Sequence, residues 1–220
     1  KRNIHELIRD KQVWTEPLTE EEKALGFRGW HSRGYLPHFD APGTRQLVTY
    51  RLADSMPASR RHEWSALFEI EDDRERRTKI EAYLDAGHGE CHLRMPESAA
   101  LVQANLLHFD GARYRLLAWV VMPNHVHALI ETLATPLEEV LHSWKSYTAK
   151  AANHLLGRTG GFWQDEYFDR YIRDEDHLRK VVRYLENNPV KAGLVKLPEE
   201  WPFCSARYRS DRSVGGSPAR

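Results

Sequence analysis

The sequence contains only two cysteines, Cys91 and Cys204, among its 220 residues. Cysteines so far apart match neither a zinc-binding spacing nor a disulfide framework, and this favours a reducing, cytoplasmic setting. The chain also lacks any run of about 18 apolar residues, so we expect neither a membrane-spanning helix nor a membrane partner. The charged segment 1–14 has no apolar core of the kind that a signal peptide needs.

The chain has no excess of either charge, since 32 Lys and Arg residues balance 32 Asp and Glu residues. This balance argues against broad, non-specific binding to phosphates, which depends on excess positive charge. A local basic groove remains compatible with it. The 41% hydrophobic content is sufficient for a substantial core.

Periodicity and breaker residues predict a mixed order of strands and helices. Alternating apolar residues favour strands at 44–53, 113–122, 125–132 and 167–172. Helices are expected at 3–12, 19–24, 57–84, 96–107, 136–156 and 174–188. We therefore predict an α+β domain with a mostly antiparallel sheet flanked by helices. It spans 44–206, after a loop-rich arm at 1–43 and before a basic, flexible tail at 207–220.

Two histidines stand out in the segment AWVVMPNHVHALIE (118–131), which otherwise reads as a strand hairpin. His125 and His127 are two residues apart, so both imidazoles leave the same face of a strand. Such a pair is compatible with a solvated face, or with two ligands of a divalent metal that needs a third from elsewhere. No HExxH motif is present, and Leu129 stands where a third alternate histidine would be.

A second candidate group lies on the helix expected at 174–188. Leu178, Val181, Val182 and Leu185 form its buried stripe, which places Tyr184 on a flank rather than in the core. Asn188 lies one turn further along the same flank. On the helix alone, the favoured interpretation is an ordinary flank tyrosine with its hydroxyl in water. A tyrosine and an amide placed there are also able to reach a metal and a phosphate together.

Together these features resemble the HUH single-tyrosine transposases, and among them the REP-associated tyrosine transposases. The segments that carry the resemblance lie within 27–209 and read AWVVMPNHVH, SWKSYTAKAAN, FWQDEYFDRYIRDEDHLRKVVRYLENNPVKAGLV and WPFCSARY. The resemblance implies a ferredoxin-like HUH nuclease fold. It implies a Mg²⁺ or Mn²⁺ ion held by His125, His127 and Asn188, with Tyr184 as nucleophile. Tyr147 and Tyr171 are alternative nucleophiles by residue type.

The activity implied is metal-dependent cleavage and rejoining of single-stranded DNA through a 5′-phosphotyrosine link. The implied targets are REP (BIME) hairpins with an adjacent tetranucleotide, met in the bacterial cytoplasm at the nucleoid by a monomer or homodimer. One alternative is a domesticated protein that binds such hairpins without turnover. Another is an unrelated metal hydrolase that uses only the histidine pair.

Contacts with DNA are expected from two regions. In the N-terminal arm, Arg28, Arg33 and Tyr35 are candidates to read or stack on bases, although the arm is equally compatible with packing on the domain edge. Candidate phosphate contacts are Lys145, Lys150 and Arg158, with Arg60 and Arg61, each of which is by itself no more than a surface charge.

Overall fold

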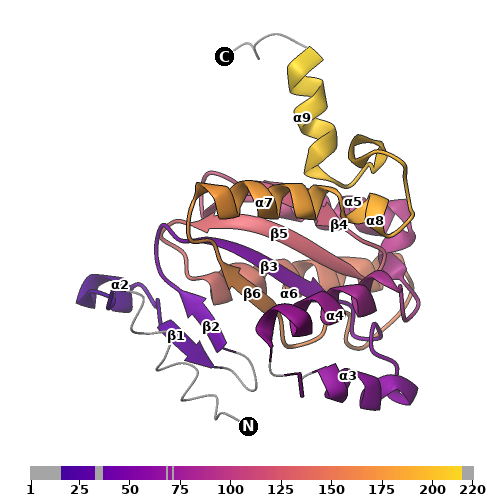
Figure 1. Cartoon of the computed structure of the whole chain (residues 1–220), viewed down its shortest axis with the longest axis horizontal. Coiled ribbons are helices and arrows are strands. Elements are labelled where there is room, and N and C mark those ends of the chain that lie inside the picture. The colour runs from indigo at the N-terminus through magenta and orange to yellow at the C-terminus, as the bar shows by residue number, and fades with distance from the viewer. Residues whose placement is uncertain (1–15, 33–36, 68, 71, 215–220) are drawn as a thin grey trace.

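The computed structural model describes residues 16–32, 37–67, 69–70 and 72–214. Its centre is a four-stranded sheet in the order β4-β5-β3-β6, in which all neighbouring strands are antiparallel (Figure 1). The strands are β3 (Arg45–Arg51), β4 (Tyr114–Val121), β5 (His125–Thr132) and β6 (Phe168–Tyr171). All four agree with the strands predicted from the sequence.

Two helices complete the topology of this sheet. Helix α5 (Pro96–His108) lies between β3 and β4 in the chain, and α6 (Leu137–Leu155) lies between β5 and β6. The resulting β-α-β-β-α-β order is that of the ferredoxin-like fold. The predicted fold class is therefore confirmed.

The two faces of the sheet carry different helices. On one face Val48 and Tyr50 of β3 pack against Val102 of α5 and Trp144 of α6. The opposite face is covered by α7 (Glu175–Glu186), whose buried stripe contacts side chains of β3, β4 and β5. Alternate residues of each strand face opposite sides, so the sheet separates the surroundings of α6 from those of α7.

The N-terminal arm contains α2 (Glu20–Ala24) and an antiparallel hairpin of β1 (Gly29–Ser32) and β2 (Pro37–Asp40). Helix α2 confirms the helix predicted at 19–24, and the one predicted at 3–12 lies outside the described residues. The hairpin lies beside β6 rather than in the main sheet (Figure 1). An arm predicted to be loop-rich is thus partly a folded hairpin.

A single helix is predicted at 57–84. The structure instead has three shorter helices there, which are η1 (Ala58–Arg60), α3 (Arg61–Leu67) and α4 (Asp73–Asp85). The Asp72 side chain accepts a hydrogen bond of 2.6 Å from the Glu75 backbone N–H. Such an N-cap starts a new helix. A short η2 (His92–Arg94) then precedes α5.

After α7 the chain forms α8 (Asn188–Lys191), η3 (Pro198–Glu200) and α9 (Ser205–Val214). Residues 207–214 of the tail predicted to be flexible belong to α9. Helix α9 is fixed to the domain because the Tyr208 hydroxyl accepts a hydrogen bond from Gln103, and Arg209 pairs with Glu186 at 2.7 Å. None of the helices in the described ranges is long and apolar enough to cross a bilayer.

Candidate active site

The two histidines lie on the face of the sheet that α7 covers. In the sheet, His127 is paired with Thr49 of β3 and His125 with Arg51. Leu47, on the same side of β3, packs with the buried residues of α7. The side chains are almost completely buried, with 1% of His125 and 2% of His127 exposed. The prediction that both imidazoles share a face is confirmed, and that face is the interior beneath α7.

The two rings face one another through their Nε2 atoms, which are 3.1 Å apart. The Nδ1–H of His125 donates to the Asn124 side-chain oxygen at 2.7 Å, because the Asn124 amide nitrogen is itself donating to the His88 carbonyl. The Nε2 of His125 is therefore the nitrogen with the free lone pair. The Nδ1 of His127 lies 2.7 Å from the Thr49 hydroxyl, which accepts or donates according to the tautomer.

Burial keeps both imidazoles neutral. It lowers the pKa of His127 to about 3, with a smaller contribution from the positive charge of Lys191. The pKa of His125 falls well below its ordinary value because of burial, and next because of His127 and Lys191. A neutral imidazole is the form that binds a metal ion, and it does so through the ring nitrogen that carries no proton.

Tyr184 lies close to this pair, from the overlying helix. Asp174 caps the start of α7 by accepting from the His177 N–H at 2.7 Å, and the stripe of Val181 and Leu185 sets the rotation of the helix. The Tyr184 ring centroid is thereby placed 6.3 Å from that of His127 in an edge-on arrangement. Its buried hydroxyl forms no hydrogen bond of good geometry with the described residues. The predicted flank position is thus an inward-facing one.

Asn188 begins α8, one turn after Tyr184. Its side chain is completely buried, and neither its oxygen nor its nitrogen has a hydrogen-bond partner among the described residues. A buried polar group without a partner costs about 1–3 kcal/mol, so a side chain with two such atoms is suited to bind a ligand. The amide oxygen is a donor that divalent metals accept. The residues present therefore fit a metal bound by two imidazoles and an amide.

Helix α4 adds two carboxylates that the sequence analysis did not find. Asp85 lies 4.0 Å from the Nε2 of His125 and 3.0 Å from the Nζ of Lys191. Glu81 is one turn earlier and lies beside the Tyr184 hydroxyl. Burial is the main cause that raises the pKa of each carboxyl group. Two acids one turn apart were the only signal in the sequence, and that spacing is equally typical of a solvated helix.

The carboxylates do not form a ready metal cage with the histidines. Within the part of the chain that the structure describes, no three His, Cys, Asp or Glu side chains are grouped closely enough to hold a metal ion. Asp85 and His125 do line a common cavity of about 210 Å³. The role of Asn188 as third ligand stays a prediction.

The burial of Tyr184 and the nearby carboxylates both affect its hydroxyl. Burial raises the pKa of Tyr184 above its ordinary value, and Glu81 and Asp85 raise it further by charge repulsion of the phenolate. The phenol is therefore protonated at neutral pH. It needs a nearby cation to act as a nucleophile.

The alternative tyrosines are on the wrong face of the sheet. Tyr147 is 57% exposed on α6, which packs on the face opposite to the histidines. Tyr171 is paired with Gln46, so it shares the side of Val48 and not that of Thr49. Of the three candidates, only Tyr184 shares the histidine face.

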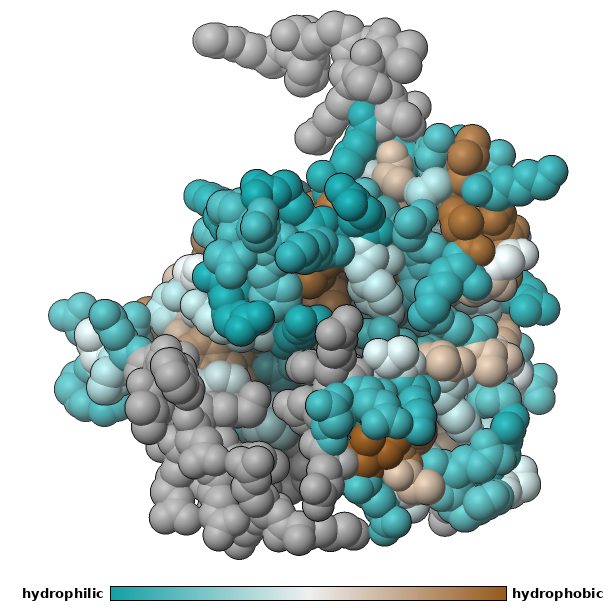
Figure 2. Space-filling view, viewed as in Figure 1, coloured by the Kyte–Doolittle hydropathy of each residue, from teal (hydrophilic) through white to brown (hydrophobic). Residues whose placement is uncertain are grey.

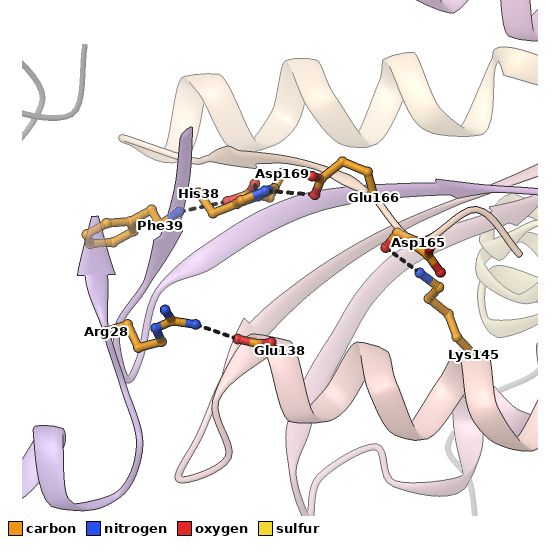
Figure 3. A network of polar contacts seen from close by, with 8 residues as sticks. All are labelled: Arg28, His38, Phe39, Glu138, Lys145, Asp165, Glu166 and Asp169. Atoms are coloured by element: carbon orange, nitrogen blue, oxygen red, sulfur yellow. Dashed lines mark hydrogen bonds and ion pairs between the residues drawn. The ribbon is translucent and has the colours of Figure 1, made fainter. Parts of the chain in front are cut away.

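The predicted DNA contacts are not brought to this face. Lys145 and Lys150 are on α6, and Lys145 donates to the Asp165 carbonyl at 2.8 Å (Figure 3). Arg158 follows α6 and donates to the Gly161 carbonyl at 3.3 Å. These three residues lie with α6 and the loop after it. They remain predictions for a DNA surface separate from the histidine pair.

The N-terminal arm is fixed to the edge of the domain, as one of the alternatives predicted. His38 of β2 is completely buried and donates to Asp169 and to Glu166, the latter at 3.0 Å (Figure 3). Arg28 pairs with Glu138 of α6 at 3.0 Å, which occupies its guanidinium within the domain. Arg33 and Tyr35 lie outside the described residues, and their predicted role is untested.

Sequence comparison now adds to this geometry. Residues 108–188, which include both histidines, Tyr184 and Asn188, match the family model described as "Transposase IS200 like". This segment is thus similar in sequence to IS200-like transposases.

Two curated proteins are also similar in sequence to this chain. The chain is 34% identical over 90 residues to the REP-associated tyrosine transposase of Escherichia coli (strain K12), which covers 41% of this chain and 53% of that protein. A Haemophilus influenzae protein described as "Putative REP-associated tyrosine transposase" is 25% identical over 103 residues, which cover 42% of this chain and 58% of that protein. The chain spans little more than half the length of these relatives. The resemblance to REP-associated tyrosine transposases is confirmed.

Among solved structures, a REP-associated tyrosine transposase bound to a REP hairpin matches with a TM-score of 0.48 and 18% identity. The match covers 86% of this chain and 91% of that one.

Proposed function

We propose that the protein is a metal-dependent single-stranded DNA endonuclease and strand transferase that acts at REP hairpin elements through a 5′-phosphotyrosine link. The observation that carries the proposal is the approach of the Tyr184 ring to the neutral histidine pair, with the buried, unpartnered amide of Asn188 one turn further along the chain. The similarity to REP-associated tyrosine transposases supports the choice of DNA and of REP hairpins.

The metal site in this proposal consists of His125, His127 and Asn188. Mg²⁺ or Mn²⁺ bound there would withdraw charge from a DNA phosphate and stabilise the departing oxygen. For this role His127 must adopt the tautomer whose Nδ1–H donates to Thr49, so that both Nε2 atoms present lone pairs. Asn124 and Thr49 thus orient the two rings.

Tyr184 supplies the nucleophile. Its oxygen attacks the phosphorus, the bond from phosphorus to the 3′ oxygen breaks, and the phenol proton is lost as the 3′ hydroxyl gains one. The phosphotyrosine ester retains the bond energy, so a 3′ hydroxyl is able to reverse the step and rejoin strands. All these residues belong to one chain, which supports a site that is complete within a single subunit.

The test is a denaturing gel with end-labelled single-stranded DNA from a REP hairpin and Mn²⁺. The parent protein should form a slowly migrating, protease-sensitive band that Tyr184→Phe abolishes. The matched control is Tyr147→Phe, which removes an exposed hydroxyl from the opposite face and should leave the band unchanged. Cleavage by Tyr184→Phe without a covalent band would instead indicate hydrolysis by water. Binding without cleavage in any cation would indicate the domesticated hairpin-binding protein.

A further inference from the structure

A hollow of about 470 Å³ lies beside α7 and α8, with Tyr184 among its lining residues. The other lining residues are Lys180, Arg183, Asn187, Val190 and Lys191. Three of the six lining residues are therefore cationic. In a chain whose total charges balance, this is a local concentration of positive charge next to the proposed nucleophile.

Lys180 and Arg183 are exposed, one turn apart, and neither has an ion-pair partner among the described residues. Their neighbour Arg179 differs, because it pairs with Asp176 on the preceding turn. The outward surface of α7 is strongly hydrophilic (Figure 2). The two cations thus remain available for an anion that enters the hollow.

The third cation of the hollow, Lys191, also contacts residues of the candidate site. The Nζ of Lys191 lies 5.8 Å from the centre of the Tyr184 ring and pairs with Asp85 of α4. Lys191 therefore pairs with the carboxylate nearest to it, and Lys180 and Arg183 are the remaining cations that line the hollow. An anionic strand is attracted to these two cations.

We propose that Lys180 and Arg183 form a binding subsite for the phosphodiesters of single-stranded DNA that flank the phosphate presented to Tyr184. This inference rests on the proposed function, and it adds the path along which the strand reaches the nucleophile. Each nucleotide carries one negative charge, so adjacent phosphates are natural ligands for cations on adjacent turns.

Binding should be measured by fluorescence anisotropy with labelled single-stranded DNA bearing a REP hairpin, in EDTA, at several salt concentrations. On single strands each phosphate contact adds about 0.7 to the slope of log affinity against log salt, or about fivefold in affinity at 0.1 M salt. The double variant Lys180→Gln/Arg183→Gln should therefore bind about 25-fold more weakly, with a slope lower by about 1.4. Arg179→Gln, the matched control on the same helix, should bind like the parent.

The inference is overturned if the double variant and Arg179→Gln have equal affinity and equal slope. A scan of single methylphosphonate linkages, which remove one phosphate charge each, sharpens the test. A methylphosphonate at one or two particular positions should weaken DNA binding by the parent but not by the double variant. If no position has this effect, the subsite is contradicted.

The covalent-band assay separates this inference from the proposed function. If the parent forms the tyrosine adduct while the double variant binds normally, the function stands and the subsite fails. If the double variant shows the expected loss while the parent forms no adduct, the subsite stands and the nuclease proposal fails.

Discussion

Replacement of Asn188 by leucine should make the metal-free protein more stable and should remove its response to metal. The side chain is completely buried, and both of its polar atoms lack partners among the described residues. Each such group costs about 1–3 kcal/mol, and an apolar side chain of similar volume removes that cost. Allowing for imperfect packing of the new side chain, we expect a gain of about 2 kcal/mol for Asn188→Leu.

These energies translate into melting temperatures that are simple to measure. For a chain of this size, 1 kcal/mol corresponds to about 2–4 °C, so the variant should melt about 4–8 °C higher in EDTA. For the parent, Mn²⁺ at 100 times its dissociation constant adds about 2.7 kcal/mol, or about 5–11 °C. The variant should show little of this rise.

Thermal unfolding followed by circular dichroism, in EDTA and in Mn²⁺, makes the comparison. The control is Asn187→Leu, the same change at an exposed neighbour, which should keep the full response to Mn²⁺. Asn188→Leu melting below the parent in EDTA would show that the amide is satisfied within the fold. An unchanged response to Mn²⁺ would remove Asn188 from the metal site.

Three further predictions concern groups away from the metal site. Burial lowers the pKa of His38, but hydrogen bonds to Asp169 and Glu166 outweigh burial and raise the pKa to about 9. In denaturant unfolding below pH 6.5, the parent should therefore be more stable than His38→Gln by up to about 3 kcal/mol. This difference in stability should shrink as the pH rises through 9. Burial raises the pKa of Asp40 to about 7, so the parent should lose stability as the pH rises from 4 to 7. Asp40→Asn keeps an acceptor for the Leu137 N–H. This variant should be more stable than the parent at pH 8 but not at pH 4. Burial raises the pKa of the Cys204 thiol to about 12, so a colourimetric thiol reagent at pH 8 should label this residue only when denaturant is added, and rapid labelling of the native protein would contradict its burial.

The sequence was informative where one local pattern determines the geometry. The strand alternation around His125 and His127 was sufficient to place both rings on one face, because the period of a strand is two. The stripe on α7 was sufficient to place Tyr184 on the flank of that helix, whereas Asn188 lies beyond its end, in α8.

The sequence was less informative where geometry depends on contacts between distant segments. The acids of α4 have the spacing of any solvated helix, and only the folded chain brings Asp85 to His125. Helix α9 was missed because its charged, Ser-rich sequence favours disorder. It is fixed by Gln103 and Glu186, which lie far from it in the chain.

The position of β5 in the sheet has a consequence for the timescales of motion at the site. Strand β5 is hydrogen-bonded to β4 on one side and to β3 on the other, so both histidines are on a strand with no free edge. Its amides should be among the slowest in the protein to exchange with solvent. Tyr184 and Asn188 instead lie on either side of Asn187, where α7 ends and α8 begins. The proposed metal ligands on the strand are therefore held by backbone hydrogen bonds on both sides, whereas the proposed nucleophile belongs to a helix that packs on the sheet through side chains alone.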